Sequence, residues 1–320
     1  MHILIVGAGQ IGSRHLQALS LTKLKIQVSV IDPSNQSLKK TKIRWKAVKK
    51  KKSSISINFY KSISELSTDV DVALITTNSY ERLNVIKKLV NLKKVKYWIL
   101  EKILAQSESD INKIKKITNT FKSINCWVNN PRRIMDWHKQ LRKNIINKGP
   151  LKISYFARSN WGLACNSIHF IDLAMWWSGE VIKSINTTKL GKKWFKAKRK
   201  GYFEVNGELS ILFSKGSKLT ISSNSNIRSN LIKVGLNDGT QWIINEKSGK
   251  AFNSKKKRLN GKYEFQSKMT HKLIEQIIRE NKCDLPNIVE SAKAHKPFIK
   301  AMLKHWNKSN SANRKYVPIT

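Results

Sequence analysis

The sequence predicts a two-domain protein of the α/β and α+β classes. A doubly wound parallel sheet is followed by a mostly antiparallel sheet backed by helices. Through the first 128 residues, short apolar runs alternate with amphipathic helical segments, a pattern typical of a parallel sheet. From Gly149 onward, alternating runs follow one another across turn residues, a pattern typical of an antiparallel meander. The expected domains are residues 1–128 and residues 129–320.

The chain has 320 residues, enough for two domains with separate cores. Its first apolar run follows Met1 without a basic leader, and no apolar run approaches the roughly 18 residues that cross a bilayer. The three cysteines are far apart and lack the spacing of metal ligands. We therefore expect a cytoplasmic protein with no membrane association, no disulfide bonds and no metal site.

The composition is strongly basic, with 62 Lys and Arg against 20 Asp and Glu and a net charge of +42. The excess is spread over nearly every segment, with dense clusters at residues 49–52, 192–200 and 255–258. No aromatic stacking platform accompanies these clusters in register. Solvated lysine faces are the favoured interpretation, followed by steering of an anionic substrate and then by nucleic-acid binding.

A dinucleotide motif opens the chain. The apolar run of residues 2–6 leads into GAGQIG, in which Gly7, Gly9 and Gly12 match G-x-G-x-x-G around Gln10 and Ile11. A helix is expected over residues 13–21 and a second strand over residues 25–32. Together these features predict that the glycines bind the pyrophosphate of a dinucleotide at the start of the helix.

Asp32 ends that second strand, twenty residues after Gly12. This is the spacing of the acid that holds the ribose hydroxyls, and a carboxylate there repels a 2′-phosphate. The sequence therefore favours NAD as the cofactor. Lys39 and Lys40 are close enough in sequence to keep NADP open as an alternative.

Further strands are expected at residues 56–60, 71–77, 96–100 and 123–128, with helices over residues 79–92 and 109–121. Ligands of parallel sheets bind beyond the carboxyl ends of the strands. The polar residues that follow three of these strands are therefore expected to line one crevice. They are Thr76, Thr77 and Asn78, then Glu101 and Lys102, and then Asn129, Asn130, Arg132 and Arg133.

The segment CNSIHFIDLAMWW, residues 165–177, is apolar except for a polar series. Asn166, His169 and Asp172 recur at intervals of three, so on a helix they lie along one ridge. One interpretation is a structural polar pair at a helix start. The other is an acid/base group that faces a cleft. The neighbouring Trp176 and Trp177 are expected in the core.

In the second half we expect strands at residues 151–159, 207–214, 217–224, 230–238 and 240–245. Helices are expected over residues 165–177, 267–281 and 288–306. His138, His271 and His295 lie on helix-like stretches without ligand partners at metal spacing. The predicted domain is an antiparallel sheet backed by helices.

Four motifs carry a resemblance to a known family: GAGQIGSRHLQAL, ITTNSYERL, EKILA, and NSIHFIDLAMWW after GPLKISYFARSNWG. Over essentially its whole length the chain resembles the glucose–fructose oxidoreductase/inositol dehydrogenase (Gfo/Idh/MocA) family. The resemblance implies that Lys102 and His169 are catalytic and that Asn129 to Arg133 lead into the substrate-binding domain. Three positions depart from the family pattern: Ile103 replaces proline, Cys165 replaces aspartate, and Arg82 stands near a common histidine.

The expected function is an oxidoreductase that moves a hydride between nicotinamide and a hydroxyl or keto carbon. His169 would remove the hydroxyl proton and Lys102 would stabilise the alkoxide. Asp172 would anchor locally or orient His169.

The expected substrate is a sugar, a nucleotide sugar or a cyclitol. One role considered for such an enzyme is the synthesis of sugars for surface polysaccharide. The substrate would contact Asn130, Arg132, Arg133, Asn166 and His169, and the arginine pair favours an anionic ligand. A homodimer or homotetramer through the C-terminal sheet is expected. A non-catalytic dinucleotide-sensing regulator and, less favoured, a nucleic-acid-binding protein are the alternatives.

Overall fold

A computed structural model describes residues 1–48, 55–119, 125–159, 161–227 and 230–320. The predicted lysine cluster at residues 49–52 lies outside the described residues, as do the end of the predicted helix 109–121 and the start of the predicted strand 123–128. The chain divides into two compact units. The first contains residues 1–105, 112–129 and 264–288, and the second contains residues 106–111, 130–263 and 289–320. The predicted boundary between residues 128 and 129 stays a prediction.

The first unit is built on a six-stranded parallel sheet in the order β3-β2-β1-β4-β5-β6. This order is typical of dinucleotide-binding domains. Leu4, at the centre of β1, lies between Ser29 of β2 and Ala73 of β4. The strands are β1 (His2–Val6), β2 (Ile26–Ile31), β3 (Ile55–Tyr60), β4 (Val70–Ile75), β5 (Val95–Leu100) and β6 (Cys126–Val128).

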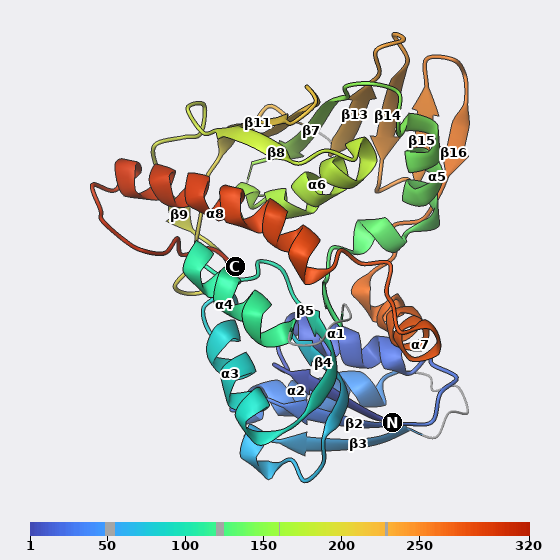
Figure 1. Ribbon diagram of the computed structural model, residues 1–320, viewed down its shortest axis with the longest axis vertical. Coiled ribbons are helices and arrows are strands. Elements are labelled where there is room, and N and C mark those ends of the chain that lie inside the picture. The colour runs from blue at the N-terminus through green and yellow to red at the C-terminus, as the bar shows by residue number, and fades with distance from the viewer. Residues whose placement is uncertain (49–54, 120–124, 160, 228–229) are drawn as a thin grey trace. The chain divides into compact units, whose positions relative to one another are not determined.

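Helical crossovers connect these strands: α1 (Gln10–Leu19), α2 (Asn35–Lys46), α3 (Arg82–Leu92) and α4 (Glu108–Thr118). Because parallel crossovers are right-handed, α1 and α2 cover one face of the sheet and α3 the other (Figure 1). A short 3₁₀ helix, η1 (Ile63–Glu65), precedes β4. Late in the chain, η3 (Gln266–Lys268) and α7 (Thr270–Glu280) return to this unit and pack against α1.

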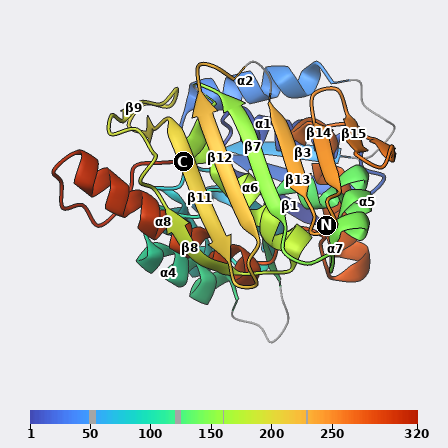
Figure 2. The same cartoon turned by 90° about the horizontal axis from the view of Figure 1, so that it is seen from above.

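The second unit is built on an eight-stranded sheet in the order β16-β15-β14-β13-β7-β12-β11-β8. Figure 2 shows these strands side by side, with α6 behind them. All neighbours are antiparallel except β7 and β12. The strands are β7 (Lys152–Arg158), β8 (Ile182–Asn186), β11 (Gly207–Phe213), β12 (Lys218–Asn224), β13 (Leu231–Gly235), β14 (Gln241–Asn245), β15 (Lys250–Asn253) and β16 (Arg258–Asn260).

The remaining elements of the second unit are η2 (Pro131–Ile134), α5 (Asp136–Ile145), α6 (Leu163–Ser178), α8 (Ile288–Ser309), and a ribbon of β9 (Phe195–Lys196) and β10 (Phe203–Glu204). The apolar face of α6 packs on the sheet, where Phe170 stacks on Tyr155 with ring centroids 3.7 Å apart. Trp177 is completely buried, as predicted, whereas Trp176 is half-buried beneath the guanidinium of Arg142.

The predicted fold class is confirmed: a doubly wound parallel sheet is followed by a mostly antiparallel sheet backed by helices. The expected elements occur with small changes at their ends. Several elements were not predicted, namely α2, β8, β9, β10, β15 and β16, whereas α5 contains His138, which was expected on a helical stretch. Among the described helices, none is both long and apolar enough to cross a membrane.

Candidate active site

The three glycines of the turn after β1 have different surroundings. Gly7 has φ +104°, a conformation that favours glycine. A Cβ on Gly12 would lie 1.8 Å from the carbonyl oxygen of Gly7, so α1 reaches β1 only because Gly12 has no side chain. A Cβ on Gly9 would meet no atom within 4 Å. Gly12 therefore allows α1 to pack closely against β1, whereas Gly9 leaves open space at the start of α1.

Gly9 also caps α1 without a side-chain hydrogen bond. The N–H groups of a helix's first turn lack partners within the helix, and with the helix dipole they attract anions. The open space at Gly9 lies directly before this turn. This arrangement fits a pyrophosphate group.

Asp32 is held rigidly at the end of β2. Its Oδ2 accepts a hydrogen bond from the Ala8 N–H at 2.7 Å, and its Oδ1 accepts one from the Ser34 N–H at 2.8 Å. The Thr41 hydroxyl donates to the carbonyl of Ala8 at 2.8 Å and ties α2 to the same turn. The predicted ribose acid is therefore brought to the glycine turn.

Arg44, which the sequence did not single out, also reaches this turn from α2. Its Nη2 donates to Gln10 Oε1 and its Nη1 to Ser13 Oγ, each at 2.6 Å. The contact places a guanidinium beside the first turn of α1, where it adds positive charge. Because the sequence did not predict α2, nothing indicated that Arg44 would contact the glycine turn.

Three predicted residues follow β4 and have different roles. The Thr76 hydroxyl donates to the Gly7 carbonyl at 2.6 Å and so belongs to the structure of the turn. Asn78 Oδ1 accepts from the Glu81 N–H at 2.9 Å, just before α3. Thr77 Oγ1 is buried and has no hydrogen-bond partner among the described residues. A ligand at the carboxyl end of β4 would satisfy this hydroxyl.

At the end of β5, Glu101 is buried in a polar network. Its Oε1 lies 2.9 Å from His15 Nε2 and also accepts a hydrogen bond from Asn129 Nδ2. His15 Nδ1 lies 2.9 Å from Thr270 Oγ1, and Asn129 Nδ2 donates to Gln266 Oε1 at 2.9 Å. Burial raises the pKa of Glu101, but the bonds from His15 and Asn129 and the charges of His15 and Lys102 outweigh it, so the pKa is lowered. Glu101 is therefore held as a carboxylate.

Lys102 is half-buried, and the peptide bond that follows it is cis. Fully buried Arg82 fixes the turn beyond it by donating to the carbonyls of Ile103 and Leu104. The same guanidinium donates to the carbonyl of Thr77. Arg82, which stands near a position where many members of the family have a histidine, thus ties the ends of β4 and β5 together.

In the second unit, α6 carries Asn166 and His169. The helix begins after Gly162, whose φ of +87° favours glycine. The buried carboxylate of Glu204, from β10, accepts hydrogen bonds from the N–H groups of Ala164 at 2.8 Å and Cys165 at 3.2 Å. A carboxylate at a helix N-terminus is favourable, so Glu204 fixes the first turn of α6.

The polar ridge of α6 is divided between different partners. Asn166 donates through Nδ2 to the Trp161 carbonyl at 2.8 Å, and His169 is half-buried. Asp172 receives two hydrogen bonds from Arg133, at 2.9 and 2.7 Å. Burial raises the pKa of Asp172, and the contact with Arg133 opposes that rise. Asp172 is therefore a local anchor for Arg133.

The predicted substrate arginines both have carboxylate partners. Besides Asp172, Arg133 contacts Glu290 at 3.0 Å. Arg132 donates to both oxygens of Glu246, at 2.8 and 2.7 Å, and its guanidinium lies over the Phe170 ring. Such bidentate pairs occupy much of the fork that would grip an anion. The geometry favours a structural role for both arginines.

Glu246 makes the chain sensitive to acid. Burial raises its pKa, but Arg132 and His138 outweigh this and lower the pKa from 4.5 to about 2. A folded-state pKa below the unfolded value adds stability that is present above pH ~4.5 and lost as pH falls toward ~2. The shift corresponds to about 3 kcal/mol.

We expect Glu246→Gln to lower the free energy of unfolding at neutral pH by about 3 kcal/mol. The difference from the native chain should shrink as pH falls, because the native carboxylate is then protonated too. Urea unfolding at a series of pH values measures this. A difference that stays constant with pH would show that Glu246 is not held ionised by Arg132.

Asn130, two residues after β6, has an unusual environment. Its side chain is 2% exposed, and neither its amide oxygen nor its amide nitrogen has a partner among the described residues. Leaving such groups unpaired costs about 1–3 kcal/mol each. A ligand with both a donor and an acceptor would remove this cost.

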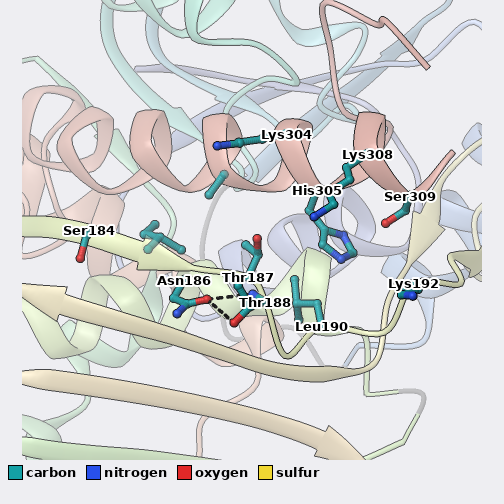
Figure 3. Close-up of a pocket in the computed structure, with 12 residues that line it drawn as sticks. Ser184, Asn186, Thr187, Thr188, Leu190, Lys192, Lys304, His305, Lys308 and Ser309 are labelled. Carbon is teal, nitrogen blue, oxygen red and sulfur yellow. Dashed lines mark hydrogen bonds between the residues drawn. The ribbon is translucent and has the colours of Figure 1, made fainter. Parts of the chain in front are cut away.

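A cavity of about 790 Å³ lies elsewhere in the second unit, between α8 and the chain that follows β8 (Figure 3). It contains none of the predicted site residues. Lys192, Lys304 and Lys308 are three of its 12 lining residues. This fraction of basic residues is only a little higher than that of the whole chain, in which 62 of 320 residues are Lys or Arg. The charge of the cavity therefore does not mark it as an anion site. Among the described residues, no group of three His, Cys, Asp or Glu could hold a metal ion.

Residues 1–130 match the sequence model of the Gfo/Idh/MocA family, described as the oxidoreductase family with an NAD-binding Rossmann fold. This segment belongs to that family, and the resemblance predicted from the motifs is confirmed. The predictions of an oxidoreductase and of NAD as cofactor are confirmed with it. No curated protein matches the chain.

Solved structures of the same fold cover nearly the whole chain. UDP-N-acetylglucosamine 3-dehydrogenase from Acidithiobacillus ferrooxidans is 12% identical with a TM-score of 0.71, covering 95% of this chain and 96% of its own. Lactobacillus casei scyllo-inositol dehydrogenase, solved with NAD(H) and scyllo-inositol, is 14% identical with a TM-score of 0.68, covering 96% and 97%. Myo-inositol dehydrogenase from that organism, with NAD(H) and myo-inositol, has the same identity and TM-score, covering 98% and 95%. At these identities the likeness concerns the fold.

The residues present fit NAD. Open space at Gly9, the uncapped start of α1, the fixed carboxylate of Asp32 and the unpaired hydroxyl of Thr77 match a pyrophosphate, a ribose and a further polar group. The remaining predicted cofactor contacts, Gln10, Ile11, Thr76, Asn78, Glu101 and Lys102, lie in the same unit.

Proposed function

We propose that the chain is an NAD-dependent dehydrogenase acting on a CH–OH carbon of a sugar, nucleotide sugar or cyclitol. The observation that carries this is the lysine at the end of β5. Lys102 follows the buried carboxylate of Glu101, and Arg82 fixes the turn beyond it. In a sheet of this order, that position belongs to the ligand-binding edge.

His169 is proposed as the base and Lys102 as the group that stabilises the substrate oxygen. Histidine exchanges protons near neutral pH, so it suits removal of a hydroxyl proton. The ammonium of Lys102 donates a hydrogen bond to that oxygen and stabilises the negative charge that develops there. NAD, when bound, accepts the hydride from the same carbon.

For the substrate we propose a polyhydroxylated ring recognised by amides. Asn130 offers a buried, unpaired donor and acceptor, which suits vicinal hydroxyls. Asn166 and His169 share the polar ridge of α6. Arg132 and Arg133 are paired with carboxylates, so we propose that they support the substrate site without contacting the substrate. The proposed substrate class includes a nucleotide sugar that is used to make surface polysaccharide.

The proposal is tested by incubating the purified chain with NAD and panels of inositols, free sugars and UDP-sugars while following NADH absorbance. Turnover of one class identifies the substrate. If NADH binds but no member of the panels is oxidised, and no keto form is reduced, the dinucleotide-sensing regulator becomes the better interpretation.

The cofactor prediction rests on Asp32. We expect the native chain to bind NADH more tightly than NADPH, because the fixed carboxylate accepts from a ribose hydroxyl and repels a 2′-phosphate. Asp32→Asn removes the negative charge, so the ratio of the NADPH Kd to the NADH Kd should fall about tenfold or more. Fluorescence titration with both cofactors measures this. Equal or tighter NADPH binding by the native chain would overturn it and implicate Lys39, Lys40 or Arg44.

We also propose a cytoplasmic enzyme that forms a homodimer or homotetramer through the C-terminal sheet. None of the three cysteines, all of which the structure describes, forms a disulfide bond, which suits a reducing compartment. On the sheet, Phe252 is 47% exposed, and a second copy would cover such a side chain. A small-molecule substrate is proposed, without nucleic acid or membrane as partner.

A further inference from the structure

The first unit contains a buried contact between a histidine and a carboxylate that the mechanism above does not use. His15, in the middle of α1, is 1% exposed, and its Nε2 lies 2.9 Å from Oε1 of Glu101, which is 7% exposed. A buried carboxylate is costly unless it is paired and hydrogen-bonded. The chain maintains this costly group directly before Lys102.

Both members of the pair are held from further elements. Thr270, the first residue of α7, contacts His15 Nδ1, and Asn129, just after β6, donates to Glu101 Oε1. Gln266 of η3 accepts from Asn129 and donates to Thr270 at 3.0 Å. The hydrogen bonds thus close a ring of side chains around the end of β5. A closed ring leaves Glu101 little freedom to move.

The pair also acts on Lys102 through charge. The Lys102 charge is among the interactions that lower the pKa of Glu101. Coulomb interactions are reciprocal, so the Glu101 carboxylate favours the ammonium form of Lys102 by the same energy.

We propose that His15 and Glu101 are positioning residues for Lys102. The pair ties the cofactor-binding helix α1 to the end of β5 and keeps Lys102 in its charged, hydrogen-bond-donating form. The proposal rests on the proposed role of Lys102, but its test is designed to be read without turnover.

The test uses Glu101→Gln, which keeps the shape of the side chain and an oxygen that accepts from His15. The apo chain is labelled with an amine-reactive reagent over a pH series, and the peptide containing Lys102 is quantified by mass spectrometry. We expect the midpoint pH of Lys102 labelling to fall, because the neighbouring negative charge is gone. Where turnover is measurable, its decline at alkaline pH should move down by the same amount.

Two His15 variants separate positioning from folding. His15→Gln retains a donor for Glu101 and should keep turnover within about threefold of native. His15→Leu leaves the buried carboxylate with one donor fewer and should lower both the melting temperature and turnover, the latter about tenfold. Rescue by glutamine but not by leucine supports the proposal.

Glu180→Gln is the matched control. Glu180 is also a buried carboxylate, 5% exposed, and accepts from the Lys215 N–H and the Ser217 hydroxyl in the second unit. Glu180→Gln should lower the free energy of unfolding and leave the midpoint pH of Lys102 labelling unchanged. The proposal is overturned if Glu101→Gln leaves the labelling midpoint unchanged, or if Glu180→Gln moves it equally. Since the apo chain is labelled, absence of dehydrogenase activity would overturn the proposed function separately.

Discussion

Alanine at Lys102 or at His169 is expected to lower turnover by roughly a hundredfold or more, while NADH affinity stays within about threefold of native. Loss of Lys102 removes the donor to the developing alkoxide, and loss of His169 removes the acceptor of the hydroxyl proton. Neither change touches the glycine turn or Asp32, where the pyrophosphate and ribose contacts are proposed. Steady-state kinetics and NADH fluorescence titration separate the two effects.

The pH profile distinguishes the two residues. With the native chain, the rate of alcohol oxidation should rise with pH as the histidine loses its proton, and in His169→Ala this rise should vanish. Lys183→Ala, at an exposed position of β8, is the control for loss of a lysine. A His169→Ala chain with a lower melting temperature but native turnover would make residues 165–177 a structural polar segment and contradict the prediction.

The cofactor side of the site could be predicted because its requirements are local. A glycine turn, a helix start and an acid after the next strand lie within 32 residues, and their spacing follows from chain geometry. The structure places Gly7, Gly12 and Asp32 accordingly. Strand ends were also predictable, since buried runs stop where polar residues begin.

The partners of charged side chains could not be predicted. Arg132 meets Glu246 across 114 residues, and His15 meets Thr270 across 255. No periodicity connects such positions, so the sequence did not indicate the three ion pairs that Arg132 and Arg133 form in the structure. The network around Glu101 was missed for the same reason. A helix such as α2, with few buried positions, gave no amphipathic signal either.

Gly9→Ala and Gly12→Ala are expected to fail in opposite ways, although both add one methyl group to the same motif. Gly9 has φ −69° and ψ −163°, which alanine adopts freely, and its Cβ would meet no atom. The apo Gly9→Ala chain should therefore keep its free energy of unfolding within about 1 kcal/mol of native. Its NADH affinity should fall about tenfold or more, because the methyl group would occupy the space where a pyrophosphate approaches.

Gly12→Ala should instead lose stability before any ligand is added. Its Cβ would lie 1.8 Å from the Gly7 carbonyl oxygen and 2.7 Å from Thr76 Oγ1, so α1 must move away from β1 and β4. We expect a loss of about 2 kcal/mol or more in the free energy of unfolding, with NADH binding lost as the helix start is displaced. Urea unfolding of both apo variants and NADH titration of each complete the comparison. If Gly9→Ala bound NADH like the native chain, the pyrophosphate would have to lie elsewhere, and the site built on the uncapped start of α1 would be wrong.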